Sequence, residues 1–222
     1  MAVGDVRLSR RSAFSLVEIL VVLAMIAVLL VALVPALKSF GGSSARKSTA
    51  NILLSLIEQS RVQAIRDGRA TYVVFPAAWS GSSGITDQAV LDRYFYKSAA
   101  IFEDAPDGSG TKVQVGGWKT FPSGVSLRSE IAFPAGNATS NAVWSADSFD
   151  FTPGLATGQQ FPYMKFDQTG ALVSPTAYAA GSPIHLRFFE GFVTGTYETA
   201  TTSTNKDEVI DIAPLTGRAT YL

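Results

Sequence analysis

The feature that most constrains this chain is a long apolar run near its start, over residues 14–37. Glu18 is the only charged residue in that run, and Arg7, Arg10 and Arg11 precede it. A helix of this length spans about 36 Å, which is enough to cross a bilayer core of about 30 Å. Basic residues before an apolar segment keep that end in the cytoplasm. The sequence therefore predicts a single membrane pass with the rest of the chain outside.

Three interpretations of this segment compete. A cleavable secretory signal has an apolar region of only about 7–15 residues before a small-residue site, and this run is longer. A plain signal anchor fits the length and the flanking charge, with Glu18 snorkelling to the cytoplasmic edge. A carboxylate at mid-membrane costs about 2.5–3.5 kcal/mol, and less near the interface, so an anchor tolerates Glu18 but gives it no purpose. The third interpretation uses the residues around Glu18.

The run Ala13-Phe14-Ser15-Leu16-Val17-Glu18 follows the basic leader and opens the apolar stretch. It resembles the N-terminus of type IV prepilins and pseudopilins, in which a small residue, usually Gly, precedes Phe and a short run ending in Glu. The resemblance implies cleavage between Ala13 and Phe14 by a prepilin peptidase, followed by N-methylation of Phe14. Ala13 departs from the preferred Gly. Pro35 lies where many family members have a helix-kinking proline.

Glu18 acquires a partner once the leader is removed, because Phe14 then carries a cationic α-amino group. Residues i and i+4 share a helix face, so Glu18 lies one turn above that terminus. In a bundle of such helices, Glu18 of one subunit can pair with the Phe14 amine of a neighbour. A mismatched register would leave both charges unpaired, which costs several kcal/mol. We therefore expect Glu18 to select the register of a helical assembly.

The chain is expected to have three parts: a basic leader over 1–13, a transmembrane or filament-core helix over 14–40, and a globular domain over 41–222. Glycine and serine at 41–44 predict a break, after which Ser48 or Thr49 would cap a new helix. That amphipathic helix is expected over about 48–67, with Gly68 as its C-terminal cap. Its apolar or small stripe consists of Leu53, Leu56, Ile57, Ser60 and Ala64.

The remaining sequence alternates in the manner of short β-strands. Strands are expected at 70–75, 91–99, 124–133, 147–151, 163–172, 184–189, 208–213 and 218–222, and residues 214–217 predict a hairpin between the last two. Long loops are expected at 80–84, 104–111, 137–141 and 196–206. The predicted fold class is α+β: a long N-terminal hydrophobic, pilin-like helix continuing into an amphipathic helix packed on antiparallel sheets.

The body of the chain carries a second resemblance. Leu56, Ser60-Arg61 and Ala64-Ile65, placed along a helix before a strand, are similar to the GspH/FimT group of minor pseudopilins. Residues 118–125, 166–170 and 214–219 resemble later landmarks of the same group. Insertions in the middle resemble prepilin-like cassette proteins of Verrucomicrobia. The resemblance implies a pilin-like globular domain.

Residues that could perform catalysis are sparse. The chain has no cysteine, which excludes disulfides and thiolate chemistry, and His185 is its only histidine. No serine lies in a G-x-S-x-G elbow and no glycine-rich stretch ends as a phosphate-binding loop. Glu103, Asp104 and Asp107 would suit calcium by their oxygen atoms, but their spacing does not match an EF-hand. We expect no enzyme activity, no cofactor and no metal.

Charge bears on possible partners. The formal net charge is zero, with 18 basic and 18 acidic residues. Binding to nucleic acid requires clustered cations, and the C-terminal region offers only Lys206 and Arg218, with Arg187 as a third candidate. Nucleic acid is therefore not an expected partner. A FimT-like minor pilin that binds DNA is kept as a less favoured alternative function.

The sequence favours a non-enzymatic minor pseudopilin or prepilin-like subunit of a type II secretion or type IV pilus-like filament. Its expected partners are a prepilin peptidase, other pilin or pseudopilin subunits, the inner-membrane assembly platform and the cytoplasmic membrane. Its N-terminus would lie in the cytoplasm and its globular domain in the periplasm, before it becomes part of a filament. A second alternative is a signal-anchored extracytoplasmic binding domain that does not polymerise.

Overall fold

The computed structural model describes residues 16–77, 85, 87–132, 142–154, 156–194, 197–200 and 207–222, and for 31–42 and 197–200 it describes the backbone only. The chain divides into two compact units, Met1–Gly41 and Gly42–Leu222. In the second unit a helix is followed by antiparallel sheets, so the predicted α+β class is confirmed.

Helix α1 spans Leu16–Asp67. Within the second unit its buried stripe includes Leu53, Leu56, Ile57, Ser60 and Ala64, as the sequence predicts. These positions recur every three or four residues and therefore share one face of the helix. The helix ends before Gly68, whose φ of +61° is the left-handed conformation of a C-terminal cap.

The expected break at 41–44 is wrong, because α1 runs through these residues. Ser48 and Thr49 therefore do not start a new helix. The Thr49 hydroxyl instead donates to the Ala45 carbonyl oxygen one turn earlier, at 2.9 Å. A threonine inside a helix uses its hydroxyl in this way, whereas an N-cap residue accepts from a backbone N–H.

The first sheet is built around β1 (Thr71–Val74). Strands β2 (Ser98–Asp104) and β7 (Ala156–Phe166) flank it, β3 (Lys112–Thr120) and β6 (Ser145–Phe151) lie outside them, and β8 (Leu172–Ser174) pairs with β7. All of these pairs are antiparallel. Successive strand residues point to opposite faces, so Thr71 and Val73 face away from Tyr72 and Val74.

This first sheet is strongly curled, since side chains of its two outer strands meet across the concave face. Lys112 Nζ of β3 lies 2.8 Å from Asp147 Oδ2 of β6, and the Trp118 and Phe151 rings are 5.1 Å apart at their centroids. The Tyr72 ring contacts Phe149 edge-to-face at 5.8 Å. The concave side is therefore filled with aromatic rings in the edge-to-face geometry that such pairs prefer.

The second sheet has β10 (Ile184–Thr194) at its centre. It pairs with β12 (Glu208–Ile212), β11 (Tyr197–Ala200) and β4 (Val125–Leu127), and β12 also pairs with β13 (Ala219–Tyr221). Two short strands, β5 (Ala142–Val143) and β9 (Thr176–Ala177), form a separate pair. Ile184, Leu186 and Phe188 alternate along β10 and are fully buried. This face of the second sheet supplies its part of the core.

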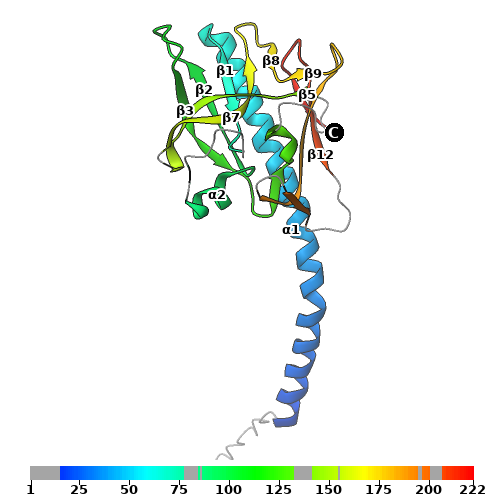
Figure 1. The fold of residues 1–222 in the computed structure, drawn as a ribbon. Coiled ribbons are helices and arrows are strands. Elements are labelled where there is room, and N and C mark those ends of the chain that lie inside the picture. The colour runs from blue at the N-terminus through cyan, green and yellow to red at the C-terminus, as the bar shows by residue number, and fades with distance from the viewer. Residues whose placement is uncertain are drawn as a thin grey trace, which may run out of the picture. The chain divides into compact units, whose positions relative to one another are not determined.

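Both sheets contact the part of α1 that belongs to the globular unit. The Ser60 hydroxyl donates to Thr71 Oγ1 of the first sheet at 2.8 Å. Arg46 lies 3.4 Å from Glu190 and 3.1 Å from Glu208 of the second sheet. Figure 1 shows this cyan segment of α1 running alongside strands of both sheets. The helix is thus the element that the two sheets share.

Most expected strands are confirmed. β1 lies within 70–75, β6 covers 147–151, β10 covers 184–189, and β12 and β13 are joined by the turn at 214–217. The expected strand at 163–172 is confirmed only as the end of β7, a turn and the start of β8.

Residues 91–99 were expected to form a strand, and this prediction is wrong. Helix α2 spans Gln88–Tyr94, and β2 begins only at Ser98. The Asp87 side chain accepts from the Ala89 amide and caps α2. The rings that suggested a strand instead pack on the core, with Tyr94 at 5.7 Å and Phe95 at 6.2 Å from Phe151. Tertiary packing therefore overrides β propensity here.

Three further strands differ from expectation. Of the expected strand at 124–133, the structure describes residues 124–132, in which Val125–Leu127 forms a strand and a 3-10 helix follows at Ser129–Ala132. Strand β3 was not predicted; Gly116 and Gly117 interrupt its alternation, and Gly116 has a φ of +78°. Strand β11 lies in the expected loop at 196–206. The expected loops at 80–84 and 137–141 contain no described residues.

Candidate processing and assembly site

Glu18 lies in the first turn of α1, and its side chain is exposed. A carboxylate in the first turn is favourable to a helix, because the N-terminal end of the helix dipole is positive. The cleavage site, the methylated residue and the basic leader lie outside the described residues: Ala13, Phe14, Arg7, Arg10 and Arg11. Pro35 lies within α1 but its side chain is not described, so the kink also stays a prediction.

The surface of α1 near Glu18 is apolar around the whole helix. Every side chain over 16–30 is exposed, including Leu16 at 81%, Leu23 at 60% and Met25 at 62%. A helix that is apolar on all sides requires an apolar environment, supplied by protein or by lipid. Among the residues that the structure describes, no helix combines the length and the apolar character that crossing a membrane requires.

This helical surface also carries a groove of about 520 Å³. Two rows of side chains at i, i+4 spacing border it: Leu20, Ala24 and Val28, and Val21, Met25 and Leu29. Ala24 is the small residue in the middle of one row, which leaves room for a side chain from another helix. Ridges and grooves of this kind are the means by which helices pack together.

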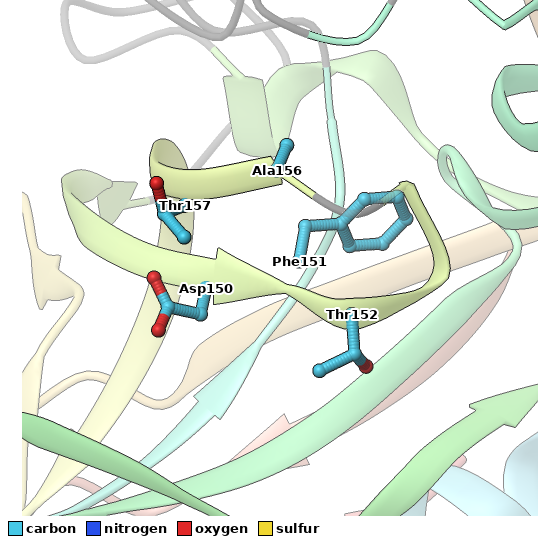
Figure 2. Close-up of a pocket in the computed structure, with 5 residues that line it drawn as sticks. All are labelled: Asp150, Phe151, Thr152, Ala156 and Thr157. Atoms are coloured by element: carbon cyan, nitrogen blue, oxygen red, sulfur yellow. The ribbon is translucent and has the colours of Figure 1, made fainter.

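The globular unit has a hollow with one carboxylate in its wall. It lies in the β6–β7 hairpin, has a volume of about 290 Å³, and is lined by Asp150, Phe151, Thr152, Ala156 and Thr157. Figure 2 shows Phe151 between the two arms of the hairpin. Asp150 already accepts a hydrogen bond from the Gly158 amide at 3.1 Å. The hollow thus offers one engaged carboxylate and no base beside it, which is not an acid–base pair.

The three carboxylates considered for calcium are each engaged by protein donors. Glu103 accepts from Gln63 at 2.8 Å and from Arg69 at 3.1 Å. Asp104 accepts from the Tyr72 hydroxyl at 2.9 Å. Asp107 accepts from Ser109, and these hydrogen bonds lower the pKa of Asp107. In the described part of the chain, no group of three or more His, Asp or Glu side chains is placed to hold a metal ion.

His185 has a structural partner on the neighbouring strand. Its Nδ1 lies 2.5 Å from Asp211 Oδ1, and the two residues are register partners in β10 and β12. The imidazole is 37% exposed. His185 therefore lies at the surface of the second sheet in a cross-strand pair.

A network of charges that the sequence analysis missed lies beside this pair. Glu130 is only 2% exposed and binds the guanidinium of Arg187, with Nε at 3.0 Å from Oε1. Arg187 also approaches Asp207 at 3.8 Å, and Arg128 donates to Asp207 from Nε at 2.8 Å. The hydrogen bond to Glu130 raises the pKa of Arg187. The sequence signal available for this network was Glu130, an acid directly before the apolar residues 131–133.

The network bears on the nucleic-acid alternative. Arg187 is neutralised by two carboxylates and is not available to contact phosphates. Lys206 lies outside the described residues, and Arg218 is a single exposed cation. Phosphate binding depends on several cations acting together, so these residues do not form a phosphate track.

Comparison with known proteins bears on the first helix. Residues 8–34 match the family described as the prokaryotic N-terminal methylation motif. The chain therefore carries the N-terminal motif of type IV prepilins, as its sequence predicts. The motif supports a type IV pilin-like or pseudopilin precursor, which implies processing by a prepilin peptidase and assembly with other pilins. Comparisons with curated proteins and with solved structures gave no match.

Proposed function

We propose that this chain is a minor, GspH/FimT-like pseudopilin or prepilin-like protein that acts as a structural subunit and not as an enzyme. It would serve a type II secretion or type IV pilus-like filament. The observation that carries the proposal is the methylation motif over residues 8–34.

Processing is the first step of the proposed function. The subunit is inserted in the cytoplasmic membrane with its leader in the cytoplasm and its globular unit in the periplasm. A prepilin peptidase cuts between Ala13 and Phe14, and Phe14 is then N-methylated. Methylation retains the positive charge of the amine, so the new terminus remains a partner for a carboxylate.

Assembly is the second step. Residues 14–40 form a helix that leaves the lipid and packs among the helices of neighbouring subunits, with an inner-membrane platform driving extraction. The all-round apolar surface over 16–30 suits both environments. Glu18 of one subunit pairs with the Phe14 amine of the next, and only the correct axial register satisfies both charges. The globular unit then lies on the outside of the filament, where it meets partners.

The test is a measurement of the N-terminus of the protein isolated from its native host. Intact mass together with N-terminal sequencing is expected to show a chain that begins at Phe14 and carries one added methyl group. An uncut chain that retains Arg7, Arg10 and Arg11 would identify the competing function, a signal-anchored binding domain that does not polymerise.

A further inference from the structure

A basic hollow in the globular unit has no role in the proposed filament core. Its volume is about 300 Å³, and it lies between the end of α2 and the connection from β3 to β4. Arg93 and Lys97 line one side, and Phe121, Pro122 and Ser123 line the other. The Phe121 amide donates to the Lys97 carbonyl oxygen at 2.7 Å, which holds the two sides together.

Seven described arginines and lysines are paired with a carboxylate, and the cations of this hollow are not among them. The arginines and lysines that have a carboxylate within 4.0 Å are Arg46, Arg61, Arg66, Arg69, Lys112, Arg128 and Arg187. Among the described residues, neither Arg93 nor Lys97 has such a partner. Within the described part of the chain, the Lys97 ammonium donates to the backbone carbonyl of Asp92, at 2.7 Å. Two cations therefore line one hollow, and neither has a carboxylate within 4.0 Å among the described residues.

The acid at the rim leaves the hollow with a net positive charge, because one carboxylate faces two cations. Asp92 lines the hollow, but its carboxylate accepts from the Gln88 amide at 2.8 Å and forms no ion pair with Arg93 or Lys97. Lys119, which is exposed, precedes the lining residue Thr120 and adds positive charge nearby. The hollow is thus a positive point on a chain of zero net charge.

The backbone beside Lys97 is held in an uncommon conformation. Tyr96 has a φ of +58° and is the only non-glycine residue with positive φ among those described. Its amide donates to the Pro76 carbonyl at 2.7 Å, and its carbonyl accepts from the Leu127 amide at 2.8 Å. Such strained residues persist where the surroundings fix them, and they are concentrated at binding sites. Lys97 is therefore presented by a fixed backbone.

We propose that this hollow binds the carboxylate side chain of an acidic segment on a partner protein. Arg93 and Lys97 supply the opposite charge, and the half-buried Pro122 side chain supplies apolar surface for the methylene groups of a glutamate. Two cations with an acid at the rim are too few to follow a nucleic-acid backbone, which favours a protein. The inference rests on the proposed function only for the partner's identity, a neighbouring subunit of the filament.

The absence of cysteine allows a direct binding test on the full chain in detergent. Ser123→Cys at the exposed rim gives a unique thiol for an environment-sensitive fluorophore. We expect a short polyglutamate peptide to change the fluorescence saturably and a polyglutamine peptide of equal length to leave it unchanged. Arg93→Gln with Lys97→Gln should weaken polyglutamate binding about tenfold, because two ion pairs are lost.

The matched control is Lys47→Gln with Arg218→Gln, which removes the same charge from two exposed positions outside the hollow. It should bind polyglutamate within about twofold of the parent, since distant exposed charges are screened. Arg93→Gln alone leaves the Lys97 hydrogen bond intact and should still weaken binding about threefold.

Equal polyglutamate affinity in the parent and the Arg93/Lys97 variant would overturn the proposal, as would the lack of saturable binding. Tighter binding of a single-stranded oligonucleotide or of inorganic phosphate, lost in the same variant, would overturn the assignment to a protein carboxylate. The assay needs neither leader cleavage nor a filament. A negative binding result therefore does not bear on the proposed function. In the same way, finding an uncut N-terminus would not bear on whether the hollow binds polyglutamate.

Discussion

Gly217 lies directly against Gly170: a Cβ atom added to Gly217 would come within 2.2 Å of the Gly170 carbonyl oxygen. Two turns from different sheets meet here, the one after β7 and the one between β12 and β13. Gly217 has a φ of +63° and Gly170 a φ of +81°, which favour glycine at both positions. The Leu172 amide donates to the Pro214 carbonyl at 2.8 Å and ties the same two turns.

The first prediction follows from this contact. Gly217→Ala should lower the free energy of unfolding by about 2–4 kcal/mol, because it adds a clash with backbone to an unfavourable φ. Gly181→Ala is the control, since Gly181 has a similar φ of +81° and nothing within 4 Å of an added Cβ. It should cost about 1 kcal/mol. Urea unfolding of the full chain in detergent measures both, and equal losses would contradict the role of the contact.

The buried ion pair gives the second prediction. Glu130→Gln should lower the free energy of unfolding by about 2–3 kcal/mol, since the Arg187 guanidinium then lacks its nearest counterion. Glu58→Gln removes an exposed partner of Arg61 at i, i+3 and should cost less than about 0.5 kcal/mol. The same urea experiment compares them. Indistinguishable midpoints for the two variants would show that Glu130 contributes no more than a surface charge.

The third prediction concerns alkaline pH. Burial, and next the hydrogen bond to Glu208 at 2.6 Å, raise the pKa of Tyr221 to about 12. A tyrosine with a raised pKa in the folded state stabilises the fold below its unfolded pKa of about 10. That contribution is lost as pH rises from about 10 to about 12. The urea midpoint of the parent should therefore fall more steeply over this interval than that of Tyr221→Phe, and parallel curves would contradict the assignment.

Cleavage of the leader gives the fourth prediction. Ala13→Leu should leave full-length precursor in the membrane, because the peptidase requires a small residue before Phe14. Ala13→Gly should be processed at least as fast as the parent. Immunoblotting of membrane fractions distinguishes precursor from mature chain by size, and normal processing of the leucine variant would rule out this cleavage site.

The fifth prediction separates assembly from processing. Glu18→Leu should still be cut, since the change lies after the cleavage site, but should fail to enter filaments because the Phe14 amine then lacks its partner. Glu58→Gln, which alters an acid in the globular part of α1, should assemble normally. Sheared filament fractions measure incorporation of each. Normal incorporation of Glu18→Leu would exclude the register role.

The elements that the sequence predicted well share a strong local signal. The stripe from Leu53 to Ala64 repeats at helical spacing, and Gly68 marks the helix end, so both were predictable from neighbours in the chain. The hairpin at 214–217 likewise has its turn residues between two alternating runs. In each case the local preference and the final packing agree.

The errors occur where distant contacts decide. Tyr94 and Phe95 have strand-like composition, but their rings are held by Phe151, more than fifty residues away in sequence. Gly116 and Gly117 break the alternation of β3, yet residues on both sides of them pair with β2, which keeps the segment in a strand. The hollow at Arg93 and Lys97 was missed for the same reason, because one of its sides comes from the β3–β4 connection. Contacts between segments that are distant in the sequence leave no local sequence pattern from which they could be predicted.

The curl of the first sheet has a consequence for solubility. The outer edge of a flat sheet is a template on which strands of other chains can aggregate. Here Lys112 of β3 reaches Asp147 of β6 across the concave face, so the two outer strands are bent toward one another. The irregular backbone at Gly116 and the charge of Lys119 further disfavour pairing of β3 with a strand of another chain. In the proposed function the subunit assembles through its N-terminal helix, and this curl would keep its strands from forming a second, unwanted contact between subunits.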